Sequence, residues 1–242
     1  METPKLNFNH WLKEWNKAIG NAVAYSNKNI APWSSFQGTL NECETEILKI
    51  TTKQNPSDSE IFKVIDLINQ WGGKTSRMFY TIRRNQTASS REQIMNEPNL
   101  SYYKEGVRLS KDNNFNAVNS FIKVNGIGAS FMGKHATFWS NFNMVIIDNK
   151  IAGVLGFNNP NLLLAQNNYN EFMSHINNIK ISNKLETPVN VERSLFSFHN
   201  NYFDNNNTRF KNNIIDFTDL NYAIYIAEKL NIPVPLELKN RI

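Results

Sequence analysis

The chain of 242 residues has one cysteine, Cys43. A single thiol excludes a disulfide within the monomer, and it excludes an iron–sulfur cluster or a zinc site built from several cysteines. The four histidines do not show the spacing of metal ligands; they are His10, His135, His175 and His199. We therefore expect neither zinc nor an iron–sulfur cluster as a cofactor.

Long apolar runs are also missing. The first residues, METPKLNFNHWLKEW, contain no apolar core of a secretion signal. No segment approaches the about 20 consecutive apolar residues that a membrane-spanning helix needs. These two absences predict a cytoplasmic protein with no membrane partner.

The charge balance is mildly basic, with 26 Lys and Arg against 21 Asp and Glu and a net charge of +5. Such an excess is compatible with a nucleic-acid partner. Many of the cations precede a glycine-rich turn, and they form either an ordinary solvated helix face or a surface that follows phosphates. They are Lys74, Arg77, Arg83, Arg84, Arg91, Lys104, Arg108 and Lys111, with Phe79 and Tyr80 between them.

Apolar residues recur mainly at helical spacing, which predicts an all-α fold. We interpret residues 1–242 as a single domain, since 40% hydrophobic residues can fill one core or two small lobes. Cap residues and periodicity together set the expected helices. These cover residues 10–24, 40–51, 59–71, 114–123, 129–139, 149–156, 169–179, 189–198 and 218–230.

The most informative segment begins with a helix that ends at Gly126-Ile127-Gly128. Glycine enters left-handed backbone conformations without steric cost, so this tripeptide predicts a tight hairpin between two helices. A glycine at the start of the second helix leaves backbone N–H groups open, and with the helix dipole they form a site for an anion such as a DNA phosphate. The ordinary alternative is a helix–turn–helix corner.

Asp148 follows the apolar run 144–147 and begins the next helical pattern. Its ordinary role is to cap the N-terminus of that helix. The same position holds a carboxylate rigidly beside an apolar wall, where it is suited to face a developing positive charge.

The hairpin and the aspartate together resemble the helix-hairpin-helix DNA glycosylase superfamily. The family hairpin is typically L-P-G-V-G, followed by a helix and then by V-D at a helix start; this chain has V-N-G-I-G at 124–128 and Ile147-Asp148. The motifs G-I-G-A-S-F-M-G-K-H and I-I-D-N-K-I-A look closest to the bacterial 8-oxoguanine-glycosylase-like branch. The resemblance covers residues 113–157 and implies a two-lobed helical architecture with the active cleft between the lobes.

Two departures from the family pattern affect the implied chemistry. Asn125 replaces the usual proline, and Ser130 occupies the position of the lysine that forms a Schiff base in bifunctional members. Serine cannot form an imine, so the resemblance implies a monofunctional enzyme without lyase activity. Asp148 would stabilise an oxocarbenium-like sugar and orient the attacking water. Lys134, one helical turn after Ser130, is either a substitute amine or a phosphate contact.

The remaining implied site residues fall into three sets. DNA contacts are expected from Lys74, Arg77, Lys123, Gly126, Ile127, Gly128 and Ser130. The flipped base is expected against aromatic residues, each of which is otherwise a core residue: Trp33, Trp139, Phe142 and Phe196, with segment 191–196 as a further wall. By the resemblance, backbone carbonyls of Ile122, Val124 and Ile127 hold a K⁺ or Na⁺ ion.

The resemblance implies a monomer that acts on double-stranded DNA carrying a modified base. The base is an oxidised purine, as in base excision repair, or a hypermodified cytosine of phage DNA, such as glucosylated hydroxymethylcytosine, as in antiviral defence. Two other classes of function remain open at this point. One is a non-catalytic DNA-binding module that recognises modified or distorted DNA, and the other is an all-α protein-interaction domain.

Overall fold

The computed structural model describes residues 5–24, 36–72, 81–83, 86–87, 93–154, 166–202 and 217–229. The predicted helical class is confirmed. Helices in these ranges are α1 (Phe8–Trp15), the π-helix η1 (Asn16–Gly20), α2 (Leu40–Thr51), α3 (Asp58–Gly72), α4 (Asn99–Lys111), α5 (Ala117–Phe121), α6 (Ala129–Trp139), α7 (Asn149–Val154), α8 (Gln166–Ser182), α9 (Pro188–Tyr202) and α10 (Phe217–Lys229). The strands β1 (Thr81–Arg83) and β2 (Gln86–Thr87) form a small antiparallel pair.

Helices α2 and α6 have the predicted bounds because local signals define their ends. Thr39 and Glu42 form a reciprocal capping box at the start of α2, in which each side chain accepts a hydrogen bond from the backbone N–H of the other. Helix α6 begins directly after Gly128 and ends at Trp139. In both cases the sequence carries the start signal within a few residues of the helix.

The prediction for residues 10–24 is wrong at both ends. Asn7 caps α1 by accepting a hydrogen bond from the His10 N–H at 3.1 Å, so the helix starts earlier. Beyond η1 the chain becomes extended, and the Ala24 N–H donates to the Gly38 carbonyl at 2.8 Å. This backbone pairing places the end of the N-terminal segment against the start of α2.

Helix α4 was absent from the predicted set. Its buried face includes small and polar residues, among them Gly106 and Ser110, so its apolar periodicity is weak. Gly106 is needed for close packing, because a Cβ atom there would lie 2.7 Å from Cε1 of Phe121. The contact with α5, and not an apolar pattern in its own sequence, therefore explains why this segment packs as a helix.

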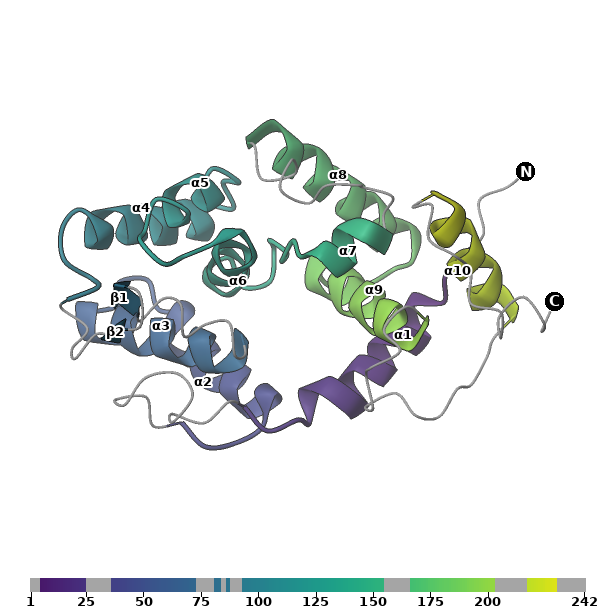
Figure 1. Ribbon diagram of the computed structural model, residues 1–242, viewed down its shortest axis with the longest axis horizontal. Coiled ribbons are helices and arrows are strands. Elements are labelled where there is room, and N and C mark those ends of the chain that lie inside the picture. Colours follow the sequence, from purple (N-terminus) through teal and green to yellow (C-terminus); the bar gives the residue numbers. More distant parts are fainter. Residues whose placement is uncertain are drawn as a thin grey trace.

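The helices form two groups (Figure 1). In one, α6 packs against α2, α3, α4 and α5, whereas in the other α9 packs against α1, α7 and α8. Segment 140–148, which begins with a turn at 140–144, connects α6 to α7 between the two groups. Buried residues of both groups belong to one continuous hydrophobic cluster, so the junction between the groups is part of the core.

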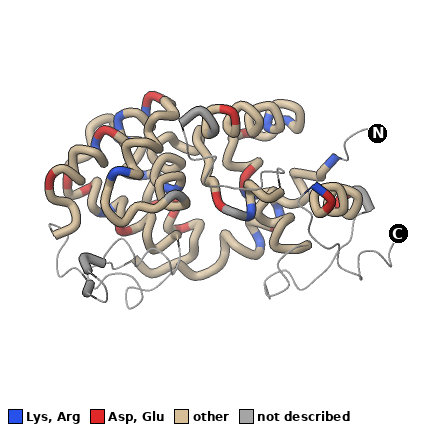
Figure 2. Tube along the Cα trace, turned by 45° about the horizontal axis from the view of Figure 1, so that its top comes forward, with Lys and Arg blue, Asp and Glu red and all other residues tan. Residues whose placement is uncertain are grey.

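Acidic and basic positions are interspersed along the described helices (Figure 2). No described helix has both the length and the apolar character needed to cross a membrane.

Candidate active site

The predicted hairpin lies between α5 and α6. Gly126 has a φ angle of 84°, in the left-handed region where glycine is favoured. The Ile127 N–H donates to the Val124 carbonyl at 3.1 Å, and the side chains of both residues are buried. The Val124 carbonyl, one of the expected cation ligands, thus already accepts one hydrogen bond within the turn.

Asn99, a residue that no sequence motif indicated, holds the hairpin in place. The Asn99 side chain, which is buried at the start of α4, accepts a hydrogen bond from the Asn125 N–H at 3.1 Å. Its amide group donates to the Ile94 carbonyl at 2.8 Å. The backbone of Asn125 is therefore fixed by a hydrogen bond to a side chain of another helix.

Gly128 is not required by the packing or backbone of the described protein. Its backbone is extended, with φ −82° and ψ 174°, which any residue adopts. A Cβ atom at this position would meet nothing within 4 Å. Gly128 is exposed at the N-terminus of α6, where a side chain would restrict the approach of an external group to the first-turn N–H groups.

The segment before Asp148 lies very close to α6. A Cβ atom on Gly133 would be 3.1 Å from the Ile146 Cα and 3.3 Å from the Ile147 nitrogen. From the other side, the Tyr169 hydroxyl of α8 donates to the Val145 carbonyl at 2.8 Å. The missing side chain at Gly133 therefore allows the segment that leads to Asp148 to lie against α6.

Asp148 is the N-cap of α7, as its ordinary role predicts. Its Oδ1 accepts hydrogen bonds from the N–H groups of Lys150 at 3.0 Å and Ile151 at 2.9 Å. Within the described residues its Oδ2 forms no hydrogen bond. The carboxylate is thus held by one oxygen, while the other is available to a ligand.

Lys134 and Ser130 form a hydrogen-bonded pair on α6, with 2.9 Å between the Lys134 Nζ and the Ser130 Oγ. Burial lowers the pKa of Lys134, while the negative charges of Asp148 and Glu192 act in the opposite direction. The amine therefore lies beside Ser130, and it is close enough to Asp148 to interact with its charge.

Glu192 of α9 completes this group of charges. Burial raises the pKa of Glu192 to about 8, and the charge of Asp148 adds to the effect, whereas Arg193 and Lys134 oppose it. At neutral pH the carboxyl is therefore mainly protonated. Glu192 lies in segment 191–196, which the sequence predicts as a polar and aromatic wall, but no titrating role was predicted for it, since its only sequence signal is a charge inside an apolar helical pattern.

A buried ion pair joins the two helix groups next to the site. Arg193 Nη2 lies 2.5 Å from Glu44 Oε1, and the Trp71 Nε1–H donates to the same oxygen at 3.0 Å. The guanidinium carbon of Arg193 is 4.1 Å from the Trp15 ring centroid and 5.2 Å from that of Phe142. These contacts join α1 and α9 to α2, α3 and the connecting segment.

Three of the expected base-pocket residues lie in the described part of the chain. Trp139 is fully buried in the core, where its Nε1–H donates to the Tyr103 hydroxyl at 3.0 Å, so its ring has no free face for a base. Phe142 is partly buried against Arg193. Phe196 is partly buried beneath Lys150, whose Nζ lies 5.2 Å from its ring centroid. Trp33, Lys74 and Arg77 lie outside the described residues.

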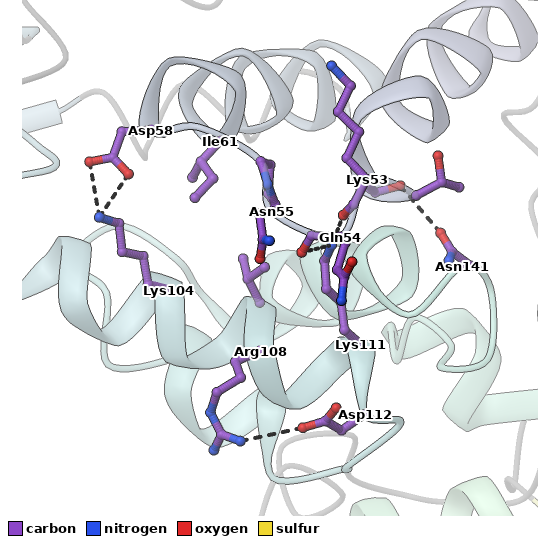
Figure 3. A pocket seen from close by; sticks show the side chains of 14 residues that line it. Lys53, Gln54, Asn55, Asp58, Ile61, Lys104, Arg108, Lys111, Asp112 and Asn141 are labelled. Carbon is purple, nitrogen blue, oxygen red and sulfur yellow. Dashed lines mark hydrogen bonds and ion pairs between the residues drawn. The ribbon is translucent and has the colours of Figure 1, made fainter.

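Three cations of the basic region line a different hollow (Figure 3). Lys104 pairs with Asp58 at 2.8 Å and Arg108 with Glu105 at 2.7 Å. The Lys111 ammonium donates to the Lys53 carbonyl. These charges therefore connect α4 to the first residue of α3, to the loop after α2 or to another residue of α4, and each has a partner within the described part of the chain.

Similarity to known proteins gives no further guidance: no protein-family model matches the chain, and no curated protein or solved structure is significantly similar to it. Across the described residues, no group of three or more His, Cys, Asp or Glu side chains is arranged to hold a metal ion. The functional interpretation therefore rests on the geometry of the site.

Proposed function

We propose that the protein is a monofunctional DNA N-glycosylase, which flips a modified base out of duplex DNA and hydrolyses its N-glycosidic bond to leave an abasic site. The observation that carries the proposal is the position of Asp148. Its carboxylate is fixed through one oxygen and interacts electrostatically with Lys134, on the helix that begins at the open hairpin. The first two turns of α6 thus connect the backbone N–H groups that would bind a phosphate with Lys134, which interacts with the carboxylate that would face the sugar.

The hairpin supplies the DNA contact in this proposal. The first-turn N–H groups of α6 bind a phosphate, and Gly128 leaves that approach open. Lys123, which is exposed on the hairpin beside Tyr102, adds a cation. Base flipping costs a few kcal/mol, which these backbone contacts offset. We further propose that the two helix groups are the lobes of the glycosylase architecture and that the protein acts as a monomer in the cytoplasm.

Asp148 supplies the main electrostatic effect. Cleavage of an N-glycosidic bond produces an oxocarbenium-like sugar, which an adjacent fixed carboxylate stabilises. Its Oδ2, which forms no hydrogen bond within the described residues, then orients the water that attacks the sugar and accepts its proton. Ser130 provides no amine for an imine, and Lys134 places a positive charge near Asp148.

A base-release assay tests this function. The protein is incubated with bacterial genomic DNA, oxidised DNA and phage DNA that carries glucosylated hydroxymethylcytosine, and alkali-labile sites are counted. We expect sites from the wild type on one of the modified DNAs and none from Asp148→Asn. Asn caps helices as well as Asp, so this variant retains the fold. Asp112→Asn, which removes an exposed carboxylate, is the matched control.

The outcome separates the classes of function. Sites made by the wild type and by Asp112→Asn, but not by Asp148→Asn, support a glycosylase, and the cleaved DNA identifies the base. DNA binding without sites on any of the three DNAs contradicts the proposal and favours a binding module. Gly128→Ala should weaken DNA binding without loss of stability; unchanged affinity would favour a protein-interaction domain.

A further inference from the structure

We propose that Glu192 is the general acid that protonates the departing base, an inference that rests on the proposed glycosylase function. It assigns the second half of the reaction, since Asp148 acts on the sugar and the water but cannot donate a proton while it is ionised. The argument depends on where α9 places this side chain and on what surrounds it.

The position of Glu192 brings it to the reacting charges. Helix α9 packs against α7, whose first turn is capped by Asp148. The residue is 7% exposed, and within the described residues its carboxyl forms no hydrogen bond. A buried carboxyl without such partners is costly unless it meets a ligand or stays neutral.

Charged groups from four elements act on Glu192. Burial is the largest cause of its raised pKa, and the charges of Asp148 at the N-cap of α7 and of Glu44 from α2 act in the same direction. Lys134 of α6 and Arg193 of α9 oppose them. The balance favours a carboxyl that still holds its proton at neutral pH and can release it to a base.

Glu44, the other buried glutamate nearby, does not fit this role. Its Oε1 accepts hydrogen bonds from Arg193 at 2.5 Å and from the Trp71 indole at 3.0 Å. A carboxylate held by a guanidinium is an ion-pair partner and not a proton donor. Two carboxyl groups at one site with different environments, here Asp148 and Glu192, are the usual arrangement for a charge stabiliser and an acid.

The proposed step is balanced. The C1′–N bond breaks, and its electron pair goes to the base, which takes the proton of Glu192. Water forms a bond to C1′, and its proton goes to Asp148. Transfer of that proton to Glu192, directly or through solvent, restores both groups. The net reaction adds one water across the glycosidic bond and needs no other reactant.

Single-turnover base release across a pH series tests the proposal. The probes are phage DNA with glucosylated hydroxymethylcytosine and an oxidised duplex, and the variants are Glu192→Gln and the matched control Glu171→Gln, which changes an exposed residue of α8. Loss of a general acid reduces rates by about 10² to 10⁴ fold. We expect such a loss for Glu192→Gln, a wild-type rate that falls above pH about 8, and no such fall in the residual rate of the variant.

Thermal unfolding shows whether Glu192→Gln retains the fold, and infrared spectroscopy gives a readout that does not depend on turnover. A protonated carboxyl band should be present in the wild type at neutral pH and absent in Glu192→Gln. The role of Glu192 is overturned if Glu192→Gln keeps the wild-type rate and pH profile, or if the wild type lacks this band. In either case, base release that depends on Asp148 would still support the glycosylase. A wild type that releases no base from either probe overturns both.

Discussion

The ion pair between Arg193 and Glu44 predicts a large loss of stability when it is broken from one side. Side-chain exposures of 12% for Arg193 and 9% for Glu44 show that both charges are largely removed from water. Replacing Arg193 by Met keeps the length and apolar stem of the side chain but leaves Glu44 as a buried charge without its cation. Burial already raises the pKa of Glu44, and the positive charge of Arg193 is the largest opposing cause.

The expected magnitude follows from this geometry. Removal of one partner of a buried pair costs about 3 to 5 kcal/mol. For a domain of this size this corresponds to a fall in Tm of roughly 6 to 20 °C. A surface pair gives the contrast: Lys17 and Glu14 lie 2.9 Å apart with exposures of 71% and 26%, and such pairs contribute about 0 to 1 kcal/mol.

The assay is thermal and urea unfolding of Arg193→Met, of the control Lys17→Met, and of the double variant Glu44→Leu/Arg193→Met, followed by circular dichroism and tryptophan fluorescence. Because an apolar pair avoids the unpaired charge, the double variant should regain most of the loss. The reasoning is refuted if Arg193→Met is no less stable than Lys17→Met, or if the double variant is less stable than the single one.

Three further predictions concern the site. Gly133→Ala should lower the Tm, because the new Cβ meets backbone at 3.1 Å, whereas Gly128→Ala should leave the Tm unchanged; equal Tm values would contradict the close packing. Between pH about 7 and 8, the free energy of unfolding of the wild type should fall by up to about 1.4 kcal/mol per pH unit, and that of Glu192→Gln should not. The reason is that folded Glu192 keeps its proton up to a pKa of about 8, whereas the unfolded chain has already released it; burial lowers the pKa of His135 to about 3, so this histidine stays neutral in the folded state over the same range. Parallel stability curves for wild type and variant would contradict this. Borohydride should trap no protein–DNA adduct, and an adduct that disappears in Lys134→Ala would show that this amine replaces the missing family lysine.

Local sequence alone determined several features of this protein. The capping residues of α2 and the N-cap at Asp148 each depend on groups within about four residues along the chain, which is the range of helix-terminus hydrogen bonds. Gly126 likewise marks the turn before α6, although the side chain of Asn99, 26 positions earlier, also holds that turn. The same local signals indicated the all-α class, because apolar periodicity reports which face of a helix is buried.

Tertiary structure decided the rest, because burial and long-range pairing depend on which helices meet. Helix α4 has a small-residue face that only its contact with α5 explains, and Trp139, expected at a base pocket, belongs to the core. Glu44 and Arg193 are 149 positions apart in the chain and meet through the packing of the two helix groups. Likewise, Glu192 became a candidate acid because the fold buries it beside Asp148 and Lys134, and no spacing in the sequence encodes that environment.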